Sequence, residues 1–321
     1  MTVVGIHASH EQIHPAELLE AVRHAESAGF TAAMSSDHFS PWSERQGHSG
    51  FAWSWLGAAL ATTSLPFGVV NAPGQRYHPA IIAQASATLA AMFPGRFWVA
   101  LGTGEASNEH ITGDRWPRKD VRNARLRECV DVIRALHRGE EVSHDGLVKV
   151  DRARIWTLPE EPPLLLAAAV SAETAAWAAD WADGIITIHQ PAEALRSLLG
   201  AYRDAGGRGT AHLQVHLSYA RDDETALRIA HEQWRTNVFS PPVCWDLELA
   251  EHFDEAARHV DPEDVQGSVL VSSDPARHAA WLRDAVDLGF EELYLHHVGQ
   301  ELGEFIDVFG DRVLPELGVS A

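Results

Sequence analysis

The stretch "TVVGIHASHEQIHPAELLEAVRHAESAGFTAAMSS" (residues 2–36) contains one complete strand–helix–strand unit. Residues 2–8 and 30–36 are short apolar runs of the kind that form buried parallel strands. Between them, residues 15–29 repeat apolar side chains at helical spacing and end at Gly29, a common helix terminator. This unit predicts a parallel sheet that is covered by helices.

The same alternation of an apolar run and a helical segment continues to the end of the chain. Eight strand–helix pairs predict an α/β fold whose parallel sheet closes into a (β/α)8 barrel, the TIM barrel. No linker divides the chain, so we expect a single domain over residues 1–321. The expected strands are residues 2–8, 30–36, 65–71, 96–102, 163–169, 184–189, 213–219 and 292–298, and the expected helices are residues 15–29, 51–63, 79–95, 120–138, 172–182, 191–205, 222–238, 275–289 and 301–317.

Two connections are longer than the usual loops of a barrel. Residues 139–162 carry two short extended runs around Asp145-Gly146, a pattern that predicts an appended hairpin. Residues 239–273 form a second insertion, which we expect to contain a helix of its own and to precede the last strand.

Composition excludes several classes of partner. The chain has 25 basic and 45 acidic residues and a formal charge of −20, which repels nucleic acid and anionic membranes. Cys129 and Cys244 lie far apart, and no histidine pair has a carboxylate cluster beside it, so we expect neither a disulfide framework nor a metal. The first residues lack a leader pattern, and no apolar run reaches membrane-spanning length. We therefore expect a cytoplasmic protein.

In a TIM barrel the active site lies at the carboxyl ends of the strands, so only residues just after each strand are strong candidates. Neither of the common nucleotide phosphate-loop motifs is present there. The residues that pass this filter are His7, His10, Asp37, His38, Trp42, Asn71, Thr103, Glu105, Asn108, His189, His296 and His297.

His38 is the clearest of these candidates. A neutral imidazole can take a proton from a hydroxyl group, and the neighbouring Asp37 is a candidate to orient it; the alternative is a loop histidine that satisfies a backbone carbonyl. Glu105 follows two glycines that allow a ligand to approach the backbone closely. The alternative is that these glycines only allow the turn after the strand. Trp42 offers either a flat face to a ring system or a lid packed on the rim.

These positions belong to longer motifs that resemble a known family. The chain is similar to the bacterial-luciferase-like superfamily of flavin and deazaflavin oxidoreductases, and within it to glucose-6-phosphate dehydrogenases that use coenzyme F420. The resemblance covers most of the N-terminal half and thins out beyond about residue 190. The motifs are "SDHFSPW" (36–42), "GHSGFAWSWL" (47–56), residues 76–113, "RLRECVDVIRALHRGE" (125–140) and "ADGIIT" (182–187).

The resemblance implies a role for each matching residue. His38 becomes the base that takes the substrate hydroxyl proton, Trp42 an aromatic neighbour of the reacting complex, and Glu105 the acid that protonates the cofactor ring. It also implies a non-proline cis peptide near Asn71. The residues implied to bind the cofactor are Asp37, Val70, Asn71, Gly102, Thr103, Gly104, Asn108, Ala169 and Ser171.

The chain also departs from the dehydrogenase pattern. Lysines hold the substrate phosphate in those enzymes, but the corresponding segments here are "HQPAE" (189–193) and "VQGSV" (265–269). A dianion without such cations is poorly held, which argues against a sugar phosphate. The "AAAVSAE" segment (167–173) replaces a Gly-Gly pair, though Ser171 can still open a helix that faces an anion. These departures leave the cofactor open between FMN and coenzyme F420.

The sequence therefore predicts an oxidoreductase that transfers hydride between a flavin or deazaflavin ring and a small alcohol or sugar-like hydroxyl compound. Two alternatives remain open: an FMN-dependent monooxygenase, and a non-catalytic flavin-binding barrel, against which the combined base and acid argue. By analogy with the superfamily we expect a homodimer, with residues 53–63 either at its surface or in the core.

Overall fold

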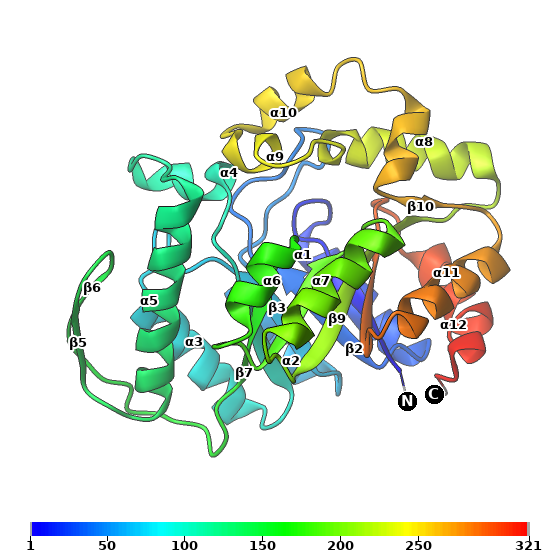
Figure 1. Cartoon of the computed structure of the whole chain (residues 1–321). Helices are drawn as coiled ribbons and strands as arrows, with labels where there is room; N and C mark the ends of the chain where they lie inside the picture. Colours follow the sequence, from blue (N-terminus) through cyan, green and yellow to red (C-terminus); the bar gives the residue numbers. More distant parts are fainter. Residues whose placement is uncertain (1, 320–321) are drawn as a thin grey trace.

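Eight parallel strands close into a barrel that is surrounded by helices in the computed structural model, which describes residues 2–319 (Figure 1). The strand order is β11-β1-β2-β3-β4-β7-β8-β9, and pairing of β9 with β11 closes the ring. The barrel strands are β1 (Val3–Ala8), β2 (Ala32–Ser36), β3 (Phe67–Asn71), β4 (Phe97–Leu101), β7 (Leu164–Ala168), β8 (Gly184–Ile188), β9 (Thr210–Ser218) and β11 (Glu292–His297).

The strand side chains alternate between two cores. Outward-facing residues such as Leu213 and Val215 of β9 join the large cluster beneath the helices, whereas Met34, Trp98 and Tyr294 fill the barrel interior. The main helices are α1 (Pro15–Ser27), α2 (Ala52–Thr62), α3 (Pro79–Met92), α4 (Ala106–Glu109), α5 (Lys119–His137), α6 (Ala172–Ala178), α7 (Ala192–Asp204), α8 (Asp223–Trp234), α11 (Pro275–Asp287) and α12 (Gly303–Arg312).

The predicted barrel is confirmed, and most expected strands agree with the observed ones to within two residues. β9 begins three residues earlier than expected, at Thr210. Each strand reads as an apolar run because both of its faces are buried. Helical predictions extend past the observed ends, since the chain leaves the helix before the glycines and prolines that mark the next turn.

Both expected insertions form structure of their own. The hairpin consists of β5 (Val142–Asp145) and β6 (Lys149–Ala153), which pair antiparallel beside α5 (Figure 1). The second insertion is richer than the single helix expected. It contains α9 (Val243–Asp246), α10 (Ala250–Ala256), a 3-10 turn (Pro262–Gly267) and the short strand β10 (Leu270–Val271). Figure 1 shows α9 and α10 across the same end of the barrel as α4.

Two further observations concern residues 2–319. The one cis peptide bond among them joins Pro241 to Pro242, so the expected non-proline cis peptide near Asn71 is wrong. In that part of the chain no helix combines the length and the apolar character needed to span a bilayer.

Close packing inside the barrel makes Gly68 of β3 a test of the fold. A Cβ atom there would overlap the indole of Trp98, whereas a Cβ at Gly57 of α2 would meet nothing within 4 Å. We expect Gly68→Ala to lower the free energy of unfolding by about 1–3 kcal/mol through overpacking. Gly57→Ala should leave it unchanged or raise it by about 1 kcal/mol. Thermal or urea unfolding measures both, and equal stability of the two variants would contradict the packing.

Candidate active site

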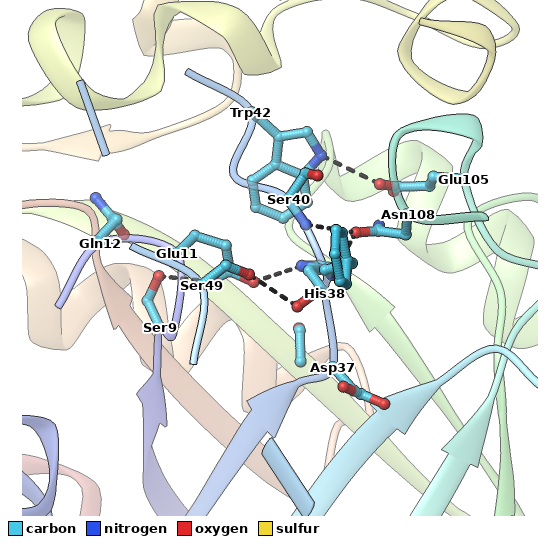
Figure 2. Close-up of polar contacts among 12 residues, drawn as sticks. Ser9, Glu11, Gln12, Asp37, His38, Ser40, Trp42, Ser49, Glu105 and Asn108 are labelled. Atoms are coloured by element: carbon cyan, nitrogen blue, oxygen red, sulfur yellow. Dashed lines mark hydrogen bonds and ion pairs between the residues drawn. The ribbon is translucent and has the colours of Figure 1, made fainter. Parts of the chain in front are cut away.

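A buried carboxylate holds the predicted base in place. His38, two residues beyond β2, donates through Nδ1 to Glu11 Oε1 at 2.5 Å (Figure 2). Ser9 Oγ donates to the other carboxylate oxygen of Glu11 at 2.8 Å. The Glu11 side chain is only 1% exposed, while that of His38 is 16% exposed. Glu11 thus fixes the imidazole through Nδ1, so Nε2 is the ring nitrogen that could take up a proton from a substrate.

The pair shifts the pKa values of both groups. Burial by itself lowers the pKa of His38, but the charge of Glu11 and its hydrogen bond outweigh burial, so the pKa lies above its ordinary value. Burial by itself raises the pKa of Glu11, and the facing His38 imidazolium reverses that shift and holds the pKa below its usual range. His38 therefore holds a proton more firmly than a free histidine does.

Trp42 and Glu105 complete a compact constellation with His38. The indole lies edge-on to the His38 ring at 4.6 Å, and its Nε1 donates to Glu105 Oε2 at 3.1 Å (Figure 2). Burial raises the pKa of Glu105, and the nearby Glu11 adds to the shift although His38 and Trp42 oppose it. A carboxyl with a raised pKa can carry a proton near neutral pH, which suits a general acid. The structure thus brings the three predicted catalytic residues together.

Asp37 does not orient His38, although the two residues are adjacent in the chain, and its predicted contact with the cofactor stays a prediction. Its carboxylate accepts hydrogen bonds from Trp53 Nε1 at 2.9 Å, Asn71 Nδ2 at 2.8 Å and Tyr77 at 3.2 Å. Arg76 lies 3.9 Å from it and donates to its backbone oxygen at 2.6 Å. The Asp37 carboxylate and the His38 imidazole therefore have separate partners. It ties β2, β3 and α2 together, and Glu11 is the residue that orients His38.

Asn108 fixes the start of the loop that carries His38. Its Oδ1 accepts from the backbone amides of Phe39 at 2.8 Å and Ser40 at 3.2 Å (Figure 2). Ser49 Oγ donates to the His38 backbone oxygen at 2.9 Å. The loop after β2 is therefore held from α4 on one side and from its own return segment on the other.

Small side chains line the mouth beside this constellation. A Cβ atom at Gly102 would lie 3.5 Å from the Cβ of Ala168, and Val70 joins the interior cluster only partly buried. Gly104 has a φ of 81°, and a Cβ there would lie 3.1 Å from Glu109 Cγ. Gly104 is therefore needed both for its positive φ and for close packing against Glu109, whereas Gly102 adds no side chain to the mouth.

The polar and apolar character of this mouth fits a flat ring with polar edges. Asn71 Oδ1 is buried without a hydrogen-bond partner in the described chain, so it offers an acceptor at the end of β3. Thr103 is half-buried beside the two glycines. Farther along the rim, Ala169 is buried and Ser171 caps α6 by accepting from the Thr174 amide at 3.3 Å. The cofactor roles of these residues stay predictions.

The remaining histidine candidates divide into two groups. His7 and His296 stack inside the barrel with ring centroids 4.4 Å apart, and His189 is half-buried at the mouth. His297 stacks on Phe305 in the outer core, and His10 is fully buried, so neither is part of the constellation. Among residues 2–319 no group of three or more potential ligands could hold a metal ion.

Glu11 contacts the predicted base, but it was not among the residues expected at the site. It lies in the loop after β1, within the region that the filter retains, beside the histidines at positions 7 and 10. A carboxylate at the carboxyl end of β1 was a signal in itself, because β1 and β2 pair in parallel register and their following loops must meet.

Fold and site together define a luciferase-like barrel. The model of the luciferase-like monooxygenase family matches residues 1–292, and the chain belongs to that family.

Several similar proteins are dehydrogenases that depend on coenzyme F420. The F420-dependent glucose-6-phosphate dehydrogenase of Nakamurella multipartita is 36% identical, over 98% of this chain and 96% of the relative. The enzyme of the same name from Mycobacterium avium is 33% identical, over 98% and 97%. Among solved structures, an F420-dependent secondary alcohol dehydrogenase in complex with an F420-acetone adduct is similar at a TM-score of 0.91 and 27% identity, with 98% of this chain and 99% of that chain covered.

The pairing of Glu11 with His38 can be tested without any ligand. Replacing Glu11 by Gln removes the negative charge that raises the pKa of His38, so we expect the His38 titration midpoint to move to lower pH. Nuclear magnetic resonance of labelled histidines measures the midpoint, with His38→Gln used for assignment. Replacement of the exposed Glu44 by Gln is the control and should leave it unchanged. An unchanged midpoint in Glu11→Gln would contradict the pairing.

Proposed function

We propose that this protein is a coenzyme F420-dependent dehydrogenase that transfers hydride between an uncharged alcohol and the deazaflavin ring. The observation that carries the proposal is the constellation of His38, Trp42 and Glu105, in which a half-buried base and a half-buried acid both contact one indole. A non-catalytic binder has no need of both groups.

The relatives favour coenzyme F420 over FMN. Those at 33–36% identity across nearly the whole chain are named F420-dependent, and the solved structure with the TM-score of 0.91 holds an F420 adduct. Val70, Asn71, Gly102 and Thr103 would hold the ring, and Asn108 would fix the loop over it. When bound, the deazaflavin supplies the ring carbon that accepts or returns a hydride.

His38 and Glu105 move the two protons of the reaction. In alcohol oxidation, Nε2 of His38 takes the hydroxyl proton, and the Glu11 carboxylate stabilises the resulting imidazolium through Nδ1. Glu105 would supply the second proton on the side where the ring is held, and the Trp42 indole would stabilise the carboxylate that remains. In the reverse direction the same groups exchange roles.

Charges around the site argue for an uncharged substrate. Glu11 and Glu105 contribute acidic groups, whereas Arg76 is already engaged by Asp37 and by Glu109, whose Oε1 lies 3.5 Å from its Nε. The segments at 189–193 and 265–269 contain no lysine or arginine. A phosphate dianion would therefore meet these carboxyl groups without a lysine or arginine from either segment. We therefore propose a neutral alcohol rather than a sugar phosphate as the substrate.

We also propose that two copies of the chain associate through the outer face of α2 and α3. Neither helix has a charged side chain, although the chain as a whole has a formal charge of −20. The tryptophans of α2 are core residues, but Phe51, Ile81 and Met92 are 53%, 54% and 59% exposed. A helix that is apolar on all sides is typical of a buried position.

Catalysis by His38 predicts a separation of turnover from binding. We expect His38→Ala to reduce the rate of F420 reduction by alcohols by about 10²–10⁴-fold, because general base catalysis is lost. The dissociation constant of F420, measured by fluorescence titration, should change little. His48→Ala, in the same loop, is the control and should keep full activity. Loss of F420 affinity in parallel with turnover would make His38 structural instead.

The charge argument predicts the choice of substrate. Secondary alcohols should reduce added F420, whereas glucose 6-phosphate at the same concentration should support less than about one hundredth of that rate. The rates are followed by the loss of the deazaflavin absorbance. Efficient turnover of glucose 6-phosphate would contradict the neutral-substrate proposal.

The apolar face predicts the oligomeric state. Ile81→Glu places a charge on the exposed face of α3 and should convert a dimer into a monomer, because burying an unpaired carboxylate is costly. Ile111→Glu is the matched control, since Ile111 is 42% exposed outside these two helices. Light scattering coupled to gel filtration gives the mass, and a dimeric Ile81→Glu variant would contradict this interface.

A further inference from the structure

Four uncharged polar side chains form a continuous hydrogen-bonded chain inside the barrel. Gln12, from the loop after β1, contacts His296 of β11, and Gln214 of β9 contacts both His296 and His216. All four are buried, with exposures between 1% and 8%. None is used by the mechanism above, and their hydrogen positions can be deduced step by step.

The deduction starts from a backbone carbonyl, which can only accept. Gln12 Nε2 lies 2.5 Å from the oxygen of Val298, so this nitrogen is the donor and Oε1 is the other end of the amide. Oε1 lies 2.8 Å from His296 Nε2, which must therefore carry a proton. Burial and the neighbouring His7 hold the pKa of His296 well below its ordinary value, so the ring is neutral. Its Nδ1 is consequently an acceptor.

The amide of Gln214 in turn fixes the proton position on His216. The Gln214 group that faces His296 Nδ1 at 3.4 Å has to be its amide nitrogen, because the imidazole nitrogen there accepts. The same Nε2 lies 3.1 Å from His216 Nε2 and can give one hydrogen to each ring. Burial lowers the pKa of His216 to about 3, so this ring is neutral too. Its single ring proton therefore resides on Nδ1.

His216 Nδ1 has no hydrogen-bond partner within residues 2–319. This atom is not fully buried, and His216 as a whole is 7% exposed. It differs in this from His7 Nδ1, which is both unpaired and fully buried. The ring lies 5.0 Å from that of Trp234, which lies 5.6 Å from Trp42 in turn. Since Trp42 contacts His38, one aromatic wall runs from the predicted base to His216.

We propose that His216 is a specificity-determining residue that donates from Nδ1 to a second, uncharged oxygen of the substrate. The inference rests on the proposed function, because it is the substrate hydroxyl at His38 that places the rest of the molecule along this wall. A donor with no charge suits an ether, hydroxyl or carbonyl oxygen. The favoured substrate class is therefore a neutral alcohol that carries one further oxygen acceptor.

Matched alcohols test the proposal. 1-Methoxy-2-propanol is paired with 2-pentanol, and 4-methoxy-2-butanol with 2-hexanol, so that within each pair an ether oxygen replaces a methylene group. We expect the wild-type protein to favour at least one ether in kcat/KM by about tenfold, the usual effect of one neutral hydrogen bond. His216→Phe should abolish that preference through a higher KM for the ether, whereas His216→Asn, which retains an N–H donor, should keep part of it.

The controls separate this inference from the proposed function. The F420 dissociation constant should be the same in the wild-type protein and in His216→Phe. No preference in the wild-type protein, or the same preference in His216→Phe, overturns the role of His216 alone. The role of His216 is also overturned if His216→Phe loses F420 affinity but keeps the preference for the ether, because His216 then contacts the deazaflavin ring and not the substrate. Absence of F420 reduction with every alcohol overturns the proposed function, and this role with it.

The tautomer provides a readout that needs neither cofactor nor substrate. Nuclear magnetic resonance of ¹⁵N-labelled histidines should show His216 as the neutral form with its proton on Nδ1, and His296 as the neutral form with its proton on Nε2. Gln214→Met breaks the chain between the two rings and should release His216 to a mixture of tautomers while leaving His296 unchanged. A wild-type His216 with its proton on Nε2 would overturn the inference.

Discussion

The site is organised by the hydrogen bond between the buried Glu11 carboxylate and the His38 imidazole. A carboxylate that is 1% exposed is stable only if it is paired, and His38 provides the pairing at 2.5 Å. The pair joins the loops after β1 and β2, which the parallel register of these strands brings together. It also raises the pKa of His38, so the same contact both joins the two loops and makes the predicted base hold its proton more firmly.

A second ionic group, around Asp37, supports the scaffold beside His38, and its predicted contact with the cofactor stays a prediction. Its hydrogen bonds to Trp53, Asn71 and Tyr77 and its contact with Arg76 hold β2, β3 and α2 in place one residue away from His38. The two adjacent side chains therefore differ in their surroundings. Asp37 is bonded to the scaffold, whereas His38 faces the mouth of the barrel. Rigid support of this kind helps to hold His38 against Trp42 at a ring separation of 4.6 Å.

The sequence predicted the barrel because buried parallel strands leave a strong signal, short β-branched runs at regular intervals. It also selected His38, Trp42 and Glu105 as candidates, since each lies in the connection after a strand, and the structure brings the three side chains together. Asp37 was the wrong candidate for the partner of His38, because its carboxylate is bonded to side chains from other segments of the chain, which adjacency in sequence does not reveal. Gln12 and His296 are 284 residues apart, and their contact depends on the closure of the barrel, which no local pattern reveals.

The pH dependence of alcohol oxidation tests the central claim most directly. In the wild-type protein with coenzyme F420, kcat/KM for a secondary alcohol should rise with pH as His38 loses its proton, at a midpoint above the ordinary histidine pKa. In Glu11→Gln that midpoint should move to lower pH, because the charge that retains the proton is gone. A rise at the same pH in both proteins would contradict the account, since the proton would then be held by a group other than the Glu11–His38 pair.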